Sequence, residues 1–78
     1  MQVKVKMPKW GEMTEGTVGE WLKKEGDLVK EGEGLVMIET EKINTEMESP
    51  ASGKLLKIFV KEFETVKIGT LLAVIEEQ

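Results

Sequence analysis

The chain has 78 residues and a formal net charge of -4 at pH 7, from 15 acidic and 11 basic side chains. It contains no histidine and no cysteine, so the commonest metal ligands and general bases are missing, and we expect neither a metal site nor catalysis by the chain itself. All basic residues are lysine, and a chain that is acidic and lacks arginine is a poor partner for nucleic acid.

The N-terminal part predicts one strand and one long loop. Residues 3–7 alternate apolar and lysine side chains, which indicates a half-buried strand that Pro8 ends. The loop at residues 9–16 carries Trp10, Glu12 and Met13. We expect Trp10 to cover the edge of the core. The alternative is that Trp10 faces a partner protein, because tryptophan is enriched in interface hot spots.

Residues 16–34 are divided by glycines into short strands. Gly19 and Gly26 would both weaken a helix, and Gly26 is expected in a turn before Asp27. We expect Trp21 to lie in the core. Later in the chain, residues 55–60 and 71–75 predict two more strands, and the last three residues are expected to fray.

A β-hairpin is predicted at residues 35–50, with Glu41 and Lys42 as its turn. Apolar or small residues recur at every second position on both sides of these two residues. The predicted partners across the hairpin are Thr40 with Ile43, Ile38 with Thr45, and Val36 with Met47. This register turns Met37, Glu39, Glu46 and Glu48 to the opposite face from Val36, Ile38, Thr45 and Met47, so that one face can be buried.

The hairpin would hold Lys42 out in solvent on a rigid support. Glu-Lys is a poor sequence for a two-residue hairpin turn, so we expect either a wider turn or a strained one. Asn44 tolerates positive φ and is expected to adopt it here, and Gly53 is expected to close the next tight turn, at residues 50–53.

The second half of the sequence repeats the first. With an offset of 37 residues, nine positions match, including Gly16 with Gly53 and Gly32 with Gly69. Residues 7–8 match residues 49–50 with an offset of 42, so the loop after Pro8 is five residues longer than its counterpart, since 42 - 37 = 5. A loop that breaks the symmetry of a compact domain is commonly functional.

Two like halves of about four short antiparallel strands each predict an all-β fold, a flattened β-barrel or sandwich with pseudo-two-fold symmetry. The hairpin tip would lie where the halves join, away from both termini. We expect residues 1–78 to form one domain, itself monomeric, of a longer chain. No apolar run approaches the ~18 residues of a membrane span, so we expect a soluble, cytoplasmic protein without a membrane partner.

Three segments make the chain resemble lipoyl domains, the carrier modules of 2-oxo acid dehydrogenase complexes. They are M-P-K-W-G-E-M-T-E-G-T-V, G-D-L-V-K-E-G-E and I-E-T-E-K-I-N-T-E-M-E-S-P-A-S-G. The resemblance implies that Lys42 carries lipoate in amide linkage, and it matches Gly26 and Gly53 to glycines that recur in the family. The chain departs from the family at Glu41, where aspartate is usual, and at Ile43, where alanine is usual.

The resemblance also implies a function and partners. Lipoyl-Lys42 would be a swinging arm that carries acyl groups and electrons between three enzymes: a thiamine-diphosphate 2-oxo acid decarboxylase, an acyltransferase core and dihydrolipoamide dehydrogenase. A lipoate protein ligase would attach the lipoate. We expect these enzymes to recognise Glu39, Glu41 and Ile43 at the tip, and Trp10, Glu12 and Met13 in the loop.

Three other interpretations stay open from the sequence. A biotin carrier has the same fold, but its lysine lies in Met-Lys-Met, unlike Lys42 between glutamate and isoleucine. A small β-domain could also only dock a partner protein. An enzyme with Glu39 and Glu41 as acid and base is the weakest alternative, because we do not expect these two side chains to converge easily.

Overall fold

The computed structural model describes residues 1–78 and consists of strands and connecting loops only. The strands, in chain order, are β1 (Gln2–Lys6), β2 (Glu15–Trp21), β3 (Leu28–Val29), β4 (Gly34–Glu39), β5 (Asn44–Glu48), β6 (Gly53–Ile58), β7 (Thr65–Lys67) and β8 (Leu71–Glu77). The chain contains no helix of the length and apolar character that crossing a membrane requires.

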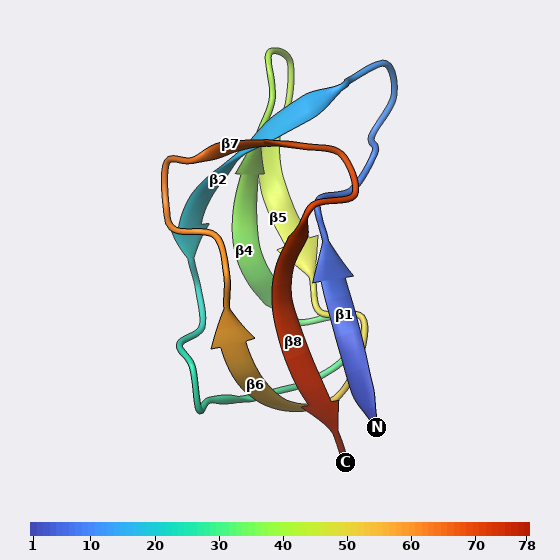
Figure 1. Cartoon of the computed structure of the whole chain (residues 1–78), viewed down its shortest axis with the longest axis vertical. Coiled ribbons are helices and arrows are strands. Elements are labelled where there is room, and N and C mark those ends of the chain that lie inside the picture. The colour runs from blue at the N-terminus through green and yellow to red at the C-terminus, as the bar shows by residue number, and fades with distance from the viewer.

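The eight strands form two antiparallel sheets of four strands each. One sheet has the order β1-β8-β6-β3 and the other β5-β4-β2-β7. Figure 1 shows the two sheets packed face to face. The predicted all-β fold is therefore confirmed. The sheets form a sandwich and do not close into a barrel.

The predicted pseudo-two-fold symmetry is visible in the strand order. The repeat relates β1 to β5, β8 to β4, β6 to β2 and β3 to β7. Replacing each strand by its repeat partner converts the order β1-β8-β6-β3 into β5-β4-β2-β7. Each sheet thus contains two strands from either half of the sequence. Hydrogen bonds repeat as well: the Trp21 N–H donates to the Glu62 carboxylate at 2.9 Å, and the Ile58 N–H donates to the Glu25 carboxylate at 2.8 Å.

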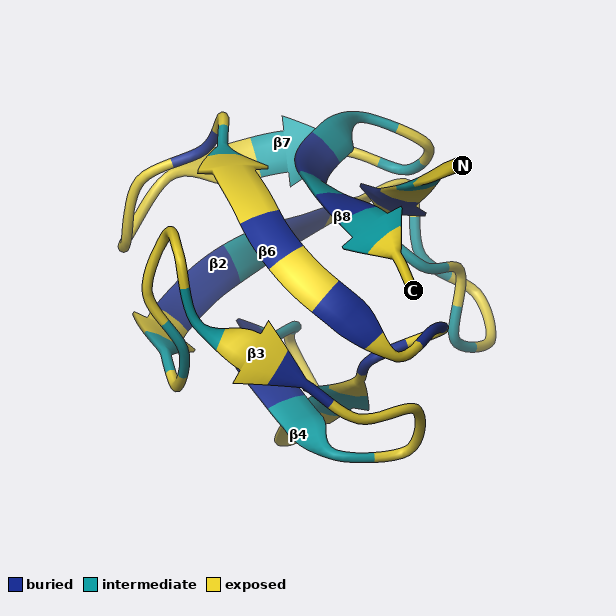
Figure 2. Ribbon diagram, turned by 90° about the horizontal axis from the view of Figure 1, so that it is seen from below, coloured by how far each residue is buried: buried dark blue, intermediate teal, exposed yellow.

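The core lies between the two sheets and follows from the alternation of side chains along each strand. In β6, for example, Leu55 is buried between the exposed residues Lys54 and Leu56, a pattern that Figure 2 shows as alternating bands. The core cluster has twelve members: Val5, Met7, Val18, Val29, Leu35, Val36, Ile38, Leu55, Val60, Leu72, Ala73 and Ile75. Trp21 is half-buried and packs against this cluster, and its indole N–H donates to the Val60 carbonyl oxygen at 2.9 Å.

The hairpin tip and the termini lie at opposite ends of the domain, as predicted. The molecule measures 34 × 19 × 18 Å, and Figure 1 shows the β4–β5 tip at the top of the long axis and both termini at the bottom. A chain that continued from either terminus would thus leave the domain far from the tip.

Several predicted strand ends differ in the structure, and β1 covers residues 2–6 where the sequence predicted 3–7. β6 begins at Gly53 and ends at Ile58, where the sequence predicted residues 55–60. The predicted fraying of the last three residues is wrong for two of them, because Glu76 and Glu77 belong to β8. They are held there by pairing with both neighbouring strands, and the Glu77 N–H donates to the Met1 carbonyl oxygen at 2.8 Å.

The two sheets differ in the charge of their exposed positions. In the β1-β8-β6-β3 sheet, the exposed positions of β1 and β6 carry Lys4, Lys6, Lys54 and Lys57. In the other sheet, the outward positions of β4 and β5 carry Glu39, Glu46 and Glu48. The sheet that contains the hairpin is therefore the acidic one.

Candidate functional site

The hairpin has the register that the sequence predicts. Ile38 pairs with Thr45 and Val36 pairs with Met47. Val36 and Ile38 are fully buried, and Met47 is half-buried against the core. Thr45 was predicted on the buried face and is exposed, because β5 is an edge strand of its sheet, whereas its buried partner Ile38 lies on the inner strand β4.

Glu41 and Lys42 form the reversal of the chain. The Thr40 N–H donates to the Ile43 carbonyl oxygen at 2.7 Å, which closes a two-residue turn. Neither turn residue has positive φ, so the turn is not one of the two types preferred in hairpins, which need positive φ. Instead, the Ile43 N–H donates to the Thr40 hydroxyl oxygen at 3.0 Å, and this side chain holds the turn closed.

The prediction that Asn44 has positive φ is wrong. Asn44 is the first residue of β5 and pairs with Glu39. Asn44 does not need the left-handed region, because the Thr40 hydroxyl accepts the Ile43 N–H and the turn residues keep negative φ.

The role of Thr40 can be tested at the tip. In Thr40→Val the Ile43 N–H loses its acceptor. We expect this to lower the free energy of local opening of the tip by about 1 kcal/mol. We expect hydrogen exchange at the Ile43 amide to become several-fold faster while Tm changes little. Thr65→Val is the matched control, because it removes a hydroxyl that contacts Thr17 at 2.7 Å and not the tip. Unchanged exchange in Thr40→Val would contradict this role.

The long loop after β1 folds back over the end of the sandwich. Met7 anchors its start, since the Met7 N–H donates to the Thr70 carbonyl oxygen and the Gly69 N–H donates to the Met7 carbonyl oxygen. The Trp10 N–H donates to the Met13 sulfur at 3.3 Å. Trp10 is half-buried and packs against the core cluster, as the sequence predicts.

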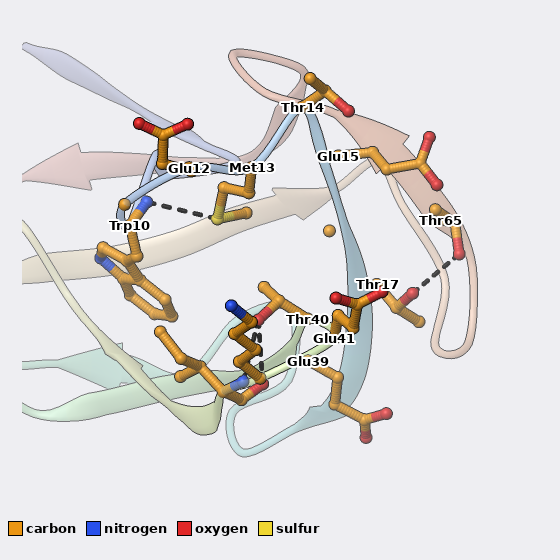
Figure 3. Close-up of a pocket in the computed structure, with 14 residues that line it drawn as sticks. Trp10, Glu12, Met13, Thr14, Glu15, Thr17, Glu39, Thr40, Glu41 and Thr65 are labelled. Atoms are coloured by element: carbon orange, nitrogen blue, oxygen red, sulfur yellow. Dashed lines mark hydrogen bonds between the residues drawn. The ribbon is translucent and has the colours of Figure 1, made fainter.

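A groove of about 730 Å³ separates this loop from the hairpin tip. Residues 10–17 line one wall, residues 39–43 line the other, and Thr65 of β7 closes one side. Figure 3 shows Trp10 and Met13 on the loop side, with Thr40 and Glu41 across from them. The structure thus brings together, around one groove, the tip residue Lys42 and the six residues predicted to be recognised: Glu39, Glu41, Ile43, Trp10, Glu12 and Met13.

The groove is acidic, and it contains one amine. Its lining includes four glutamates, Glu12, Glu15, Glu39 and Glu41, and Lys42 is its only basic residue. Lys42 is exposed and forms no hydrogen bond or ion pair with the rest of the chain. Its amine is therefore free to react with a group that another molecule brings to the tip.

Neither of the two groups with a shifted pKa lines the groove. The Lys30 backbone N–H and the Lys23 side chain, whose ammonium lies 3.2 Å from the carboxylate, lower the pKa of Glu33. A hydrogen bond from the Met1 amine to Glu76 raises the pKa of that amine. Both pairs are exposed, and they belong to the scaffold and not to the groove.

The two glycines predicted in turns have different roles. Gly26 has a φ of 97° in the turn at residues 24–27, as expected of a turn glycine. Gly53 lies in strand β6, where a Cβ would overlap the Glu76 carbonyl oxygen of β8. The prediction of a turn at Gly53 is corrected: its small size matters for close strand approach, and its φ is not positive.

Seven of the residues that line the groove were not among the predicted site residues: Gly11, Thr14, Glu15, Gly16, Thr17, Thr40 and Thr65. Glu15 and Thr17 lie on β2, which pairs with β7 through Glu15–Lys67 and Thr17–Thr65. The alternation around Gly16 could have placed Glu15 and Thr17 on the outer face. Thr65 could not be placed, because its position depends on a pairing between distant segments.

Comparison with known proteins gives one family. The sequence model Biotin_lipoyl, described as "Biotin-requiring enzyme", matches residues 3–75. The dihydrolipoyllysine-residue acetyltransferase component of the acetoin cleaving system from Pseudomonas putida is 49% identical over 72 residues, which are 91% of this chain and 20% of that protein. The succinyltransferase component of the 2-oxoglutarate dehydrogenase complex from Bartonella vinsonii is 44% identical over 77 residues, which are 97% of this chain and 19% of that protein.

Solved structures show the same fold. The lipoyl domain of the 2-oxoglutarate dehydrogenase complex from Azotobacter vinelandii superimposes with a TM-score of 0.80 at 38% identity, covering 96% of each chain. A single-chain, multi-domain long-chain acyl-CoA carboxylase superimposes with a TM-score of 0.83, covering 99% of this chain and 7% of that one. At 22% identity this second likeness concerns the fold alone. The chain spans about a fifth of the length of the acyltransferase components that it matches.

Proposed function

The chain belongs to the biotin/lipoyl attachment family and is a lipoyl domain of the kind found in acyltransferase components of 2-oxo acid dehydrogenase complexes, and from this premise we propose that Lys42 is its lipoylation site. The observation that carries the proposal is the position of Lys42, exposed at the apex of the hairpin and without a partner in the chain. The other ten lysines lie elsewhere on the domain, and none lines the groove.

The residues at the tip fit the covalent attachment of a carboxylic acid. An amide bond forms between the Lys42 Nζ and the carboxyl carbon of lipoate, and the amine loses a proton as the activating group leaves. A free carboxylate has no good leaving group, so a ligase must supply an ATP-activated lipoyl donor. The apolar side chains of Trp10, Met13 and Ile43 beside the amine suit the hydrocarbon chain that the acid brings.

The domain would contribute placement and recognition and no catalytic group of its own. When attached, the lipoyl group supplies a dithiolane that takes up an acyl group and electrons from a decarboxylase, yields the acyl group to coenzyme A at the acyltransferase core, and is reoxidised by dihydrolipoamide dehydrogenase. The hairpin keeps the attachment point away from the body of the domain, and Thr40 limits the opening of the turn. We place this activity in the cytoplasm, as the sequence led us to expect.

Tethering would make the carrier effective. Since the chain spans about a fifth of its acyltransferase relatives, we propose that it is one part of such a protein and is joined to the rest by a linker. A short flexible linker raises the effective concentration of the arm at its partners to the order of mM. The termini lie at the end opposite Lys42, so a linker at either terminus leaves the tip free to enter an active site.

The proposal is tested by incubating the domain with a lipoate protein ligase, lipoate and ATP, and measuring the intact mass. We expect the addition of one lipoyl group per chain. In a parallel reaction with a biotin ligase, biotin and ATP, we expect no addition. Attachment of biotin and not lipoate would favour the biotin carrier, and attachment of neither would favour a docking domain.

A further inference from the structure

Phe63 has a conformation and an exposure that are unusual for a phenylalanine. It is the only residue other than glycine with positive φ, at 72°, and it is 77% exposed. A bulky side chain in the left-handed region is strained, and such strain occurs mainly where function requires it. Because the ring is mostly exposed to water, its burial does not offset the free-energy cost of this strain.

The internal repeat shows that the fold does not require phenylalanine here. With the offset of 37 residues, Phe63 corresponds to Gly26, which has a φ of 97°. The two turns are otherwise alike: the Gly26 N–H donates to the Leu55 carbonyl oxygen at 2.7 Å, and the Phe63 N–H donates to the Val18 carbonyl oxygen at 2.6 Å. Glycine satisfies this geometry without strain. The phenylalanine therefore needs an explanation outside the fold.

The turn that carries Phe63 borders the end of the domain with the groove. It leads directly into β7, and Thr65, two residues after Phe63, lines the groove. Two peptide units limit the distance between the Cα atoms of Phe63 and Thr65 to about 8 Å. In Figure 1 this turn, coloured orange, lies in the half of the molecule that bears the hairpin tip.

A partner that docks over the groove would cover this turn as well. A standard protein interface buries about 800 Å² on each partner, which corresponds to a patch roughly 30 Å across. Perpendicular to its long axis the domain measures only 19 × 18 Å. A patch of that size at the groove therefore extends onto the sides of the domain. A few residues carry most of the energy of such an interface, and an aromatic ring that the partner removes from water is of the kind that does so.

The charges around Phe63 indicate the chemistry of that partner. Glu62 and Glu64 adjoin Phe63 in the sequence, and their carboxylates accept hydrogen bonds from the Trp21 and Lys61 backbone N–H groups. The neighbouring groove carries four more carboxylates, of Glu12, Glu15, Glu39 and Glu41. We infer that Phe63 is a docking residue for the decarboxylase that acylates the lipoyl group, and that this enzyme presents an apolar pocket framed by lysine or arginine side chains. The inference rests on the proposed function, because it takes Lys42 as the point that the enzyme must reach.

The test compares stability with acylation in lipoylated domains. Phe63→Asn replaces the ring by a polar residue that tolerates positive φ, and Phe63→Tyr keeps an aromatic ring. The matched control is Leu28→Asn, because Leu28 is 65% exposed and lies in β3, which pairs with the start of β6 at the far end of the domain. Each variant is offered to the thiamine-diphosphate decarboxylase that acylates the wild-type domain, with its 2-oxo acid.

We expect Phe63→Asn to raise Tm by about 4 °C, because the strain is relieved, and to lower kcat/KM for acylation about tenfold. Phe63→Tyr should retain most of the acylation rate, and Leu28→Asn should leave it unchanged. A variant that becomes more stable and at the same time a poorer substrate cannot be explained by misfolding.

The inference is overturned if Phe63→Asn is acylated as fast as the wild-type domain, or if Leu28→Asn is impaired equally. It is also overturned if the only effect of Phe63→Asn is on self-association in sedimentation experiments, which would make a second copy of the chain the occupant. Failure of the proposed function is distinguishable, because it appears earlier, as the absence of a lipoyl mass on the wild-type domain.

Discussion

Lys42→Ala is expected to abolish lipoylation completely. The ligase must choose one amine among eleven lysines, and Lys42 is the one at the apex of the hairpin and in the lining of the groove. Removal of this amine leaves no nucleophile at the position that the ligase reaches. Intact-mass measurement after treatment with ligase, lipoate and ATP should show one lipoyl addition to the wild-type chain and none to the variant.

Two further variants test whether the amine itself is required, and not only a positive charge, and whether another exposed lysine can be modified in its place. Lys42→Arg keeps a cation at the tip but offers no amine, so it should also remain unmodified. Lys61→Ala removes an exposed lysine from a turn outside the groove, and it should be modified like the wild-type chain. All these substitutions should change the free energy of unfolding by less than about 0.5 kcal/mol, because Lys42 and Lys61 are exposed. A lipoyl mass on Lys42→Ala would contradict the assignment.

Gly53→Ala is expected to destabilise the domain severely. A Cβ at this position would overlap the Glu76 carbonyl oxygen and lie 2.8 Å from the Glu76 carbonyl carbon and 2.9 Å from the Glu77 Cα. These are backbone atoms of the neighbouring strand, so no side chain can rotate away, and β6 must separate from β8. We expect a loss of about 3 kcal/mol or more, measured by urea unfolding. A domain of this size has a stability on the order of 4–12 kcal/mol, so much of it would be lost.

The repeat supplies a matched control for this substitution. Gly16 corresponds to Gly53, and it is also a buried glycine in a strand. A Cβ on Gly16 would meet the Met7 sulfur at 2.8 Å and the Met13 terminal methyl carbon at 3.3 Å. Methionine side chains are flexible and can move aside, so Gly16→Ala should cost about 1 kcal/mol or less. Equal losses in the two variants would show that strand approach is not the reason for Gly53.

The sequence predicted the hairpin and the symmetry because both depend on local or repeated patterns. Alternation on both sides of Glu41 and Lys42 determines the register, and the structure reproduces the pairing of Ile38 with Thr45. The repeat predicted two like halves, and the strand order confirms them. These features need no knowledge of contacts between distant segments.

Other parts of the site depend on contacts that the pattern does not contain. The turn was expected to require positive φ at Asn44, but the Thr40 hydroxyl accepts the free N–H of Ile43 and makes this unnecessary. Thr65 joins the groove only because β7 pairs with β2. The role of Gly53 follows from how closely β8 approaches β6, a distance that one strand alone does not reveal.

The placement of β8 in its sheet also affects how this domain can fold during synthesis. β8 lies between β1 and β6, so the first strand made has its partner in the last. While a ribosome still holds the final segment, β1 has no neighbouring strand. Its sheet then lacks β8, the strand that joins β1 to β6. Folding must then wait until residues 71–77 have left the exit tunnel, and fragments cut at the midpoint of the chain should acquire structure only when mixed.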